Sequence, residues 1–180
     1  MTLGIGGESV PLHTHVCWYY SGEEQLRETL GFLIEGLRES DDFCVIFADR
    51  ARFEELLRWL AEDLRKEPRA FIERGQLALV DGAPTTHELL AKIGARLDAA
   101  LEQGYGRIRF LGFIAWGAPG WPDDSSLLEF EAQVNEVVTA YPAVIVCTYG
   151  VPTLSGQTLI YGGLGTHRTL LLDGRVQPSD

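Results

Sequence analysis

The chain has 180 residues, of which 26 are acidic and 15 basic, so its formal net charge is −11. Hydrophobic residues make up 46% and charged residues 23%, which are ordinary values for a globular domain and exclude wholesale disorder. The acidic balance argues against direct binding to nucleic acid or to an anionic membrane, since both carry negative charge. At this length we expect a single domain over residues 1–180.

Five segments have the apolar composition of buried strands. In chain order they are residues 10–19, 42–48, 76–81, 107–116 and 143–150. Most are continuous apolar runs without alternation of apolar and polar residues. This pattern is typical of strands that are covered on both faces, as in a parallel sheet.

Apolar residues recur at helical spacing between these strands, in residues 26–37, 53–64, 89–101 and 127–138. Asp49, Thr85 and Ser126 precede three of the stripes and are predicted to cap helices. The alternation of strands and helices predicts right-handed crossovers and a three-layer α/β sandwich with a mainly parallel central sheet.

The C-terminal part of the chain has a different pattern. Residues 154–167 predict a short helix that ends at Gly162 and Gly163. Residues 168–176 predict a β-hairpin that turns at Asp173-Gly174, because Asp-Gly between apolar runs is a strong hairpin signal.

Common catalytic motifs are missing from the chain. There is no GxxxxGK[ST] loop, no GxSxG elbow and no correctly spaced GxGxxG, so we expect neither phosphate binding of those types nor a nucleophilic serine. The three cysteines are widely spaced, unlike a disulfide framework or a zinc finger. The first ten residues do not resemble a secretory signal and no apolar run could span a membrane, so we expect a cytoplasmic protein.

His13, His15 and Cys17 alternate along the first predicted strand and therefore share one face. His13 and Cys17 would lie about 13 Å apart along a strand, which is too far for both to bind one metal ion. One strand could thus supply at most two ligands. The competing interpretation is that His15 and Cys17 are packed, hydrogen-bonded residues of a central strand.

Glu131 interrupts the apolar stripe of the helix predicted over residues 127–138. A carboxylate on a buried face must be neutralised, paired or hydrogen-bonded. It either caps a neighbouring backbone or pairs with Arg107 or Arg109, or it is a polar anchor at the floor of a pocket.

Aromatic residues follow the apolar runs, at Tyr19, Tyr20, Trp116, Trp121, Tyr149 and Tyr161. Ligands of open parallel sheets bind at the carboxyl ends of the strands, where such rings could wall a cavity. Packing of large rings at the rim would explain the same pattern. His167, after a glycine-rich segment, is expected to project into this area.

The segment from His15 to Tyr20 resembles the HxCxxY opening of the MEDS family of sensory domains. Further similarities occur in the same order as in that family, at residues 32–37, 48–49, 109, 116, 128–131, 147–149, 167 and 173–174. The resemblance covers about residues 12–176. Two positions depart from the family pattern: Phe113 stands where an acidic residue is usual, and Arg168 where a proline is usual.

The resemblance implies a fold like those of RecA and the KaiC clock ATPase, without their phosphate loop. It also implies sensing of small organic molecules, usually upstream of a DNA-binding, histidine-kinase or sigma-regulatory module. Since the 180 residues hold no such module, the signal is expected to pass to a separate regulatory protein.

We therefore predict a non-catalytic sensory domain that binds a small organic ligand at the carboxyl ends of the strands. The predicted ligand-binding residues are His15, Cys17, Tyr20, Trp116, Glu131, Tyr149 and His167. Neither a cofactor nor a metal ion is required, and ordering of residues 162–166 would change the partner surface. A homo-oligomer is compatible with the sequence.

Two other functions fit the same residues. One is an enzyme or metal-binding protein that uses Cys17 with His15 or His167. The other is a pure interaction module, in which the acidic first helix attracts a basic partner.

Overall fold

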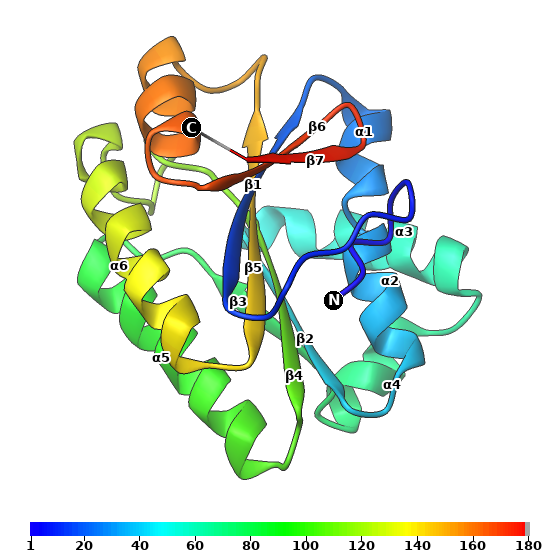
Figure 1. The fold of residues 1–180 in the computed structure, drawn as a ribbon. Coiled ribbons are helices and arrows are strands. Elements are labelled where there is room, and N and C mark those ends of the chain that lie inside the picture. The colour runs from blue at the N-terminus through cyan, green and yellow to red at the C-terminus, as the bar shows by residue number, and fades with distance from the viewer. Residues whose placement is uncertain (179–180) are drawn as a thin grey trace.

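A computed structural model describes residues 1–178 and centres on a seven-stranded sheet in the order β3-β2-β4-β5-β1-β6-β7 (Figure 1). All neighbouring strands are parallel except β6 and β7, which are antiparallel. The strands are β1 (Thr14–Tyr20), β2 (Asp42–Ala48), β3 (Leu77–Asp81), β4 (Arg107–Phe113), β5 (Ala143–Gly150), β6 (Thr169–Leu172) and β7 (Arg175–Pro178). The predicted mainly parallel sheet and the C-terminal hairpin are confirmed.

Helices cover both faces of the sheet and complete the predicted three-layer sandwich (Figure 1). One face carries α1 (Glu23–Glu28), α2 (Gly31–Arg38), α3 (Phe53–Leu64) and α4 (Pro68–Glu73). The other carries α5 (Thr86–Glu102) and α6 (Leu127–Ala140). Every residue of β2 and β5 is buried, which explains their continuous apolar runs. In the described residues, no helix is both long and apolar enough to cross a membrane.

The first strand places alternate side chains in the two cores. Val16 and Trp18 pack with α2 and α3, while Cys17 packs in the core beneath α5 and α6. His15 has the same parity as Cys17 and therefore faces α6. The alternation along β1 therefore determines which of its side chains can contact α6.

The helix predicted over residues 26–37 is broken into α1 and α2. At the break the Thr29 hydroxyl donates to the Leu26 carbonyl, 2.6 Å away. Gly31 then packs against the N-terminal segment, where a Cβ atom on Gly31 would lie 2.7 Å from the Gly4 carbonyl oxygen. A continuous stripe in the sequence therefore belongs to two short helices.

Two of the three predicted helix caps are confirmed. The Asp49 carboxylate accepts from the Ala51 amide at 2.8 Å, and the Thr85 hydroxyl accepts from the Glu88 amide at 3.2 Å. The Ser126 prediction is wrong: its hydroxyl donates to the Asp123 carbonyl at 2.8 Å, and a 3₁₀ turn over residues 124–126 leads into α6.

The predicted helix over residues 154–167 forms as a π-helix over Thr158–Leu164. The hairpin that follows turns at Asp173 and Gly174 as predicted, and both residues have positive φ, 48° and 71°. The π-helix and the chain leading to β6 lie beside α6, so they bring the end of the sequence to the last helix.

A buried ion cluster joins the amino ends of β2 and β4. Asp42 accepts from Arg107 Nε at 2.5 Å and from Arg109 Nε at 2.6 Å, and Arg109 also donates to the Thr2 carbonyl at 2.6 Å. Both arginines therefore have carboxylate partners other than Glu131. The alternative that Glu131 pairs with either of them is wrong.

Candidate functional site

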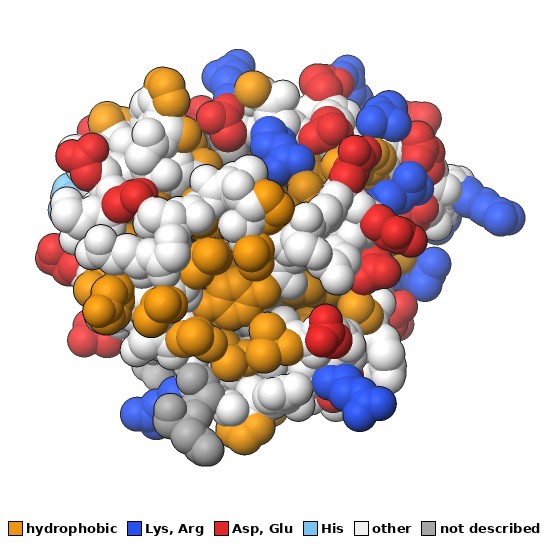
Figure 2. Space-filling model, turned by 90° about the horizontal axis from the view of Figure 1, so that it is seen from above, with side chains coloured by type: hydrophobic (Ala, Val, Ile, Leu, Met, Phe, Trp, Pro, Cys, Tyr) orange, Lys and Arg blue, Asp and Glu red, His pale blue; other side chains and the backbone are white. Residues whose placement is uncertain are grey.

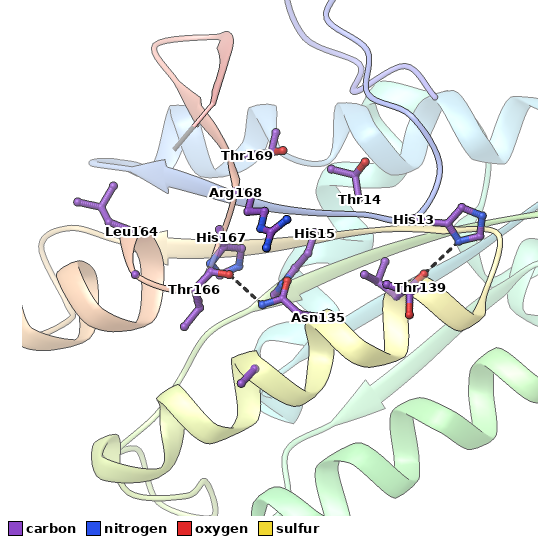
Figure 3. A pocket seen from close by; sticks show the side chains of 13 residues that line it. His13, Thr14, His15, Asn135, Thr139, Leu164, Thr166, His167, Arg168 and Thr169 are labelled. Atoms are coloured by element: carbon purple, nitrogen blue, oxygen red, sulfur yellow. Dashed lines mark hydrogen bonds between the residues drawn. The ribbon is translucent and has the colours of Figure 1, made fainter. Parts of the chain in front are cut away.

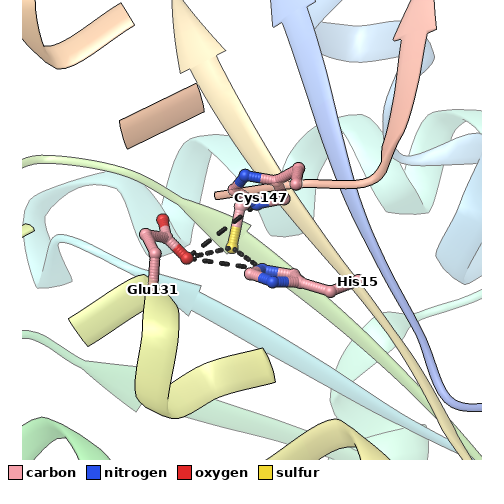
Figure 4. A group of neighbouring side chains, drawn as sticks. His15, Glu131 and Cys147 are labelled. Atoms are coloured by element: carbon pink, nitrogen blue, oxygen red, sulfur yellow. Dashed lines mark hydrogen bonds and ion pairs between the residues drawn. The ribbon is translucent and has the colours of Figure 1, made fainter. Parts of the chain in front are cut away.

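Four buried polar side chains from separate parts of the chain converge beneath α6 (Figure 4). His15 Nε2 lies 3.2 Å from Cys147 Sγ and 3.3 Å from Glu131 Oε2. His167 Nε2 lies 3.9 Å from the same Glu131 oxygen. The side chains of His15, Glu131 and His167 are at most 2% exposed. We call these four residues the polar cluster.

The fold brings each member to this point from a different element. His15 and Cys147 lie on the adjacent parallel strands β1 and β5, and both side chains face α6. Glu131 lies on the buried face of α6, one turn after Leu127. His167 lies between the π-helix and β6, two residues before the strand begins.

The Nδ1 atom of each imidazole has an acceptor on the protein. His15 Nδ1 lies 3.1 Å from Asn135 Oδ1, and the Asn135 amide in turn donates to the Thr166 carbonyl at 2.8 Å. His167 Nδ1 lies 2.9 Å from the Gly163 carbonyl. We assign the proton to Nδ1 in both rings, because both partners are acceptors. Each Nε2 then carries a lone pair directed into the polar cluster.

Burial determines the charge of the polar cluster. It raises the pKa of Glu131 to about 8, although the Tyr149 hydroxyl donates to that carboxylate. Burial lowers the pKa of His167 to about 4, and burial together with the His167 ring lowers the pKa of His15 well below its usual value. Burial also raises the pKa of the Cys147 thiol. Burial thus favours the uncharged form of each of the four groups.

One atom of the polar cluster has no hydrogen-bond partner among the described residues. It is Nε2 of His167, which is fully buried. Nearly all buried polar atoms in folded proteins are hydrogen-bonded, so such an atom marks a place that a ligand could complete.

A cavity of about 850 Å³ lies against the polar cluster (Figure 3). Its walls come from the start of β1, the second half of α6 and the chain that leads into β6. His15 and His167 belong both to the polar cluster and to the cavity wall. Other polar lining residues are His13, Thr14, Asn135, Thr139, Thr166, Arg168 and Thr169. The volume is within the usual range for a small-molecule site.

Residues 14–168 match the family described as MEDS, the methanogen/methylotroph, DcmR sensory domain. The chain belongs to this family. Its description as a sensory domain implies a sensory or signalling role and suggests a non-catalytic one. No match was found among curated proteins.

The MEDS chain is also similar in structure to a KaiC-like protein from the hyperthermophilic archaeon Pyrococcus horikoshii OT3. The two share 17% sequence identity and superpose with a TM-score of 0.69, over 94% of this chain and 78% of that one. The similarity confirms the KaiC-like fold expected from the sequence.

The MEDS chain brings together four of the seven residues predicted to bind ligand. His15, Glu131 and His167 meet in the polar cluster, and the Tyr149 hydroxyl donates to Glu131. The Tyr149 ring also meets the His167 ring edge to face, with ring centroids 5.8 Å apart. Only His15 and His167 among these residues line the cavity itself.

Cys17, Tyr20 and Trp116 lie outside the polar cluster and do not line the cavity. Cys17 faces the same core and pairs with Cys147 along the β1–β5 ladder, but the clustered thiol is that of Cys147. Tyr20 has the opposite parity and packs on the α2–α3 side. Trp116 stacks with Phe130, with ring centroids 4.7 Å apart.

The cavity is not at the carboxyl ends of the strands, where the ligand was expected. It lies at the start of β1, between α6 and the chain that leads into β6, whereas aromatic rings fill the space beyond β4. Trp116 lies there between Phe130 and Trp121, with the Trp121 ring centroid 5.5 Å from its own.

Asn135 and the role of Cys147 were not predicted from the sequence. Asn135 lies one helical turn after Glu131, so its place on the same face of α6 could have been inferred. Cys147 lies in an apolar run, where a cysteine is usually a small buried hydrophobe. Only the pairing of β1 with β5 distinguishes it from Cys17.

Proposed function

We propose that this MEDS domain is a non-catalytic sensor that binds a small polar organic molecule in the cavity beside His15 and His167. The observation that carries the proposal is a polar-lined cavity of about 850 Å³ in a chain of a sensory family. The bound state is then reported to a separate regulatory protein.

The cavity lining favours a ligand with a carboxylate or hydroxyl group. Arg168 extends toward the cavity near His15 and His167 (Figure 3), and no ion pair holds it among the described residues. Thr169 adds a hydroxyl group, while the hydroxyls of Thr139 and Thr166 already donate to backbone carbonyls and can only accept. A guanidinium group binds carboxylates through paired hydrogen bonds, and hydroxyl oxygens can accept from a ligand hydroxyl.

A non-catalytic role is supported by the state of the buried thiols. Burial raises the pKa of Cys17 and of Cys147, which keeps both in the protonated, weakly nucleophilic form. This argues against the Cys17-based enzyme considered from the sequence.

The segment over residues 158–169 is suited to transmit the bound state. Its last residues line the cavity, and the Thr166 carbonyl is tied to α6 through Asn135. The same segment exposes Ile160, Tyr161 and Leu164, and Figure 2 shows hydrophobic side chains gathered on the face above the strand ends. A ligand that binds one arrangement of this segment better would shift its population and alter the surface offered to a partner.

A thermal-shift screen of small organic acids and alcohols, followed by calorimetry, tests the proposal. Arg168→Met is expected to weaken binding of an acidic hit at least tenfold, because it removes the cationic partner. Arg175→Met is the matched control, since Arg175 lies on β7 outside the cavity lining. Equal affinity in both variants, or no hit that competes for the cavity, would overturn the proposal.

A further inference from the structure

The polar cluster has the dimensions of a coordination sphere. Its four ligand atoms all lie within 4.8 Å of one another. A tetrahedral ion with metal–ligand distances of about 2.0–2.3 Å separates its ligands by about 3.3–3.8 Å. The measured His15–Cys147, His15–Glu131 and Cys147–Glu131 separations are 3.2, 3.3 and 3.8 Å. A common centre thus needs only small side-chain shifts.

Outer hydrogen bonds orient three of the four residues, His15, His167 and Glu131, toward that centre. Each imidazole donates from Nδ1 to an oxygen, Asn135 Oδ1 for His15 and the Gly163 carbonyl for His167. Glu131 receives the Tyr149 hydroxyl on Oε1, so that Oε2 faces the cluster. Metal-binding histidines and carboxylates are typically fixed in this way by outer hydrogen bonds.

The buried Nε2 of His167 is a second, independent indication that the polar cluster binds a cation. It has no hydrogen-bond partner among the described residues, and it points at the carboxylate oxygen that His15 also approaches. A cation between these atoms would accept its lone pair. The cation alone would then account for the missing hydrogen-bond partner of His167 Nε2.

The chemistry of the four donors selects the class of ion. Two imidazoles, one thiolate and one carboxylate suit zinc and related borderline transition metals, and they are a poor set for magnesium or calcium. Binding would displace one proton from Cys147 and one from Glu131. The two negative charges then balance a divalent cation, so the buried site stays neutral.

We propose that His15, Glu131, Cys147 and His167 bind one divalent transition-metal ion, with Zn²⁺ as the natural occupant. Four protein ligands complete a tetrahedral shell, so the ion has a structural role and no open position for catalysis. His15 and His167 also line the cavity, so the ion site lies next to it. The inference does not depend on which organic molecule the cavity binds, or on whether it binds one.

Cobalt(II) titration of the reduced, metal-free protein tests this site directly, with no organic ligand present. We expect one equivalent of Co²⁺ to bind, with the intense visible bands of tetrahedral cobalt and a near-ultraviolet thiolate-to-cobalt band. One equivalent of Zn²⁺ should abolish both signals by displacing the cobalt.

The cysteine variants identify the thiolate. Cys147→Ser should eliminate the thiolate-to-cobalt band. Cys17→Ser and Cys44→Ser remove the other two buried thiols and should leave the spectrum unchanged. Circular dichroism verifies that each variant is folded. If Cys147→Ser does not fold, His167→Gln provides a second variant. It should weaken cobalt binding at least tenfold.

Four results would overturn the metal site. Three are a folded, reduced wild-type protein that binds no cobalt, a weak six-coordinate spectrum, and a thiolate band that persists in folded Cys147→Ser. Loss of the band in Cys17→Ser alone would assign the metal to the thiol considered from the sequence, and would equally contradict the proposal. Failure of the organic-ligand screen would affect none of these readouts.

Discussion

His15 Nε2 and Glu131 Oε2 lie 3.3 Å apart in the interior of the protein, although one residue is on the first strand and the other on the last long helix. The contact joins β1 to α6 beneath the cavity. Around this contact a carboxyl group and two imidazoles are buried together, and one imidazole nitrogen has no hydrogen bond among the described residues. A divalent cation would coordinate these groups.

Tyr149→Phe should weaken metal binding while leaving the four ligands in place. The variant removes the hydroxyl that donates to Glu131 Oε1, and loss of such an outer hydrogen bond typically costs about 10–100-fold in metal affinity. Competition between the protein and a zinc-binding dye measures the change. Tyr19→Phe is the control, because the Tyr19 hydroxyl donates to the Leu159 carbonyl instead. Equal losses in both variants would contradict the role given to Tyr149.

Zinc should raise the melting temperature of the wild-type protein. An ion that binds only the folded state stabilises it by about 2.7 kcal/mol at a hundredfold excess over its dissociation constant. For a domain of this size, that corresponds to about 5–10 °C. Calorimetric scans with zinc and with a chelator measure the difference, and Cys147→Ser should reduce it. The same increase in Cys147→Ser would place the stabilising ion elsewhere.

Much of the fold was predictable because its signals are local. Buried parallel strands are apolar along their whole length, and Asp173-Gly174 defines a tight hairpin turn. His15 and Glu131 could also be singled out, since each is a polar residue on an apolar face. The period of two along β1 would even have excluded Tyr20, whose side chain must point away from that of His15.

The rest depends on pairing between distant segments. Cys147 enters the polar cluster only because β5 lies next to β1, which no local pattern indicates. The cavity lies where the chain after the π-helix passes α6, and its place follows from that route rather than from strand ends. The route in turn depends on close packing at Gly163.

Gly163→Ala should destabilise the π-helix and disturb His167. A Cβ atom at this position would lie 1.9 Å from the Tyr19 hydroxyl oxygen, and the Gly163 carbonyl is the acceptor for His167. Overpacking of this kind typically costs about 1–3 kcal/mol of unfolding free energy. Urea denaturation measures it. Gly156→Ala, with open space around the added methyl, should change stability by less than about 1 kcal/mol. Similar unfolding free energies for the two variants would mean that the π-helix can shift to accommodate the added methyl group at residue 163.

Arg109→Met should be among the most destabilising single substitutions at the other end of the sheet. It leaves Asp42 buried, with only the Arg107 side chain as a cationic partner. Breaking a buried ion pair typically costs about 3–5 kcal/mol.

Arg58→Met provides the comparison for Arg109→Met in urea denaturation. The exposed Arg58–Glu62 pair is expected to contribute less than about 0.5 kcal/mol. An equally small loss of unfolding free energy in Arg109→Met would show that the buried ion cluster contributes little to stability.

The most direct test of the polar cluster as a binding site is an anomalous difference map from zinc-loaded crystals, recorded at the zinc absorption edge. Such a site predicts one strong peak at about 2.0–2.3 Å from His15 Nε2, His167 Nε2, Glu131 Oε2 and Cys147 Sγ. A map without a peak among these four atoms, in crystals soaked with zinc under reducing conditions, would contradict it.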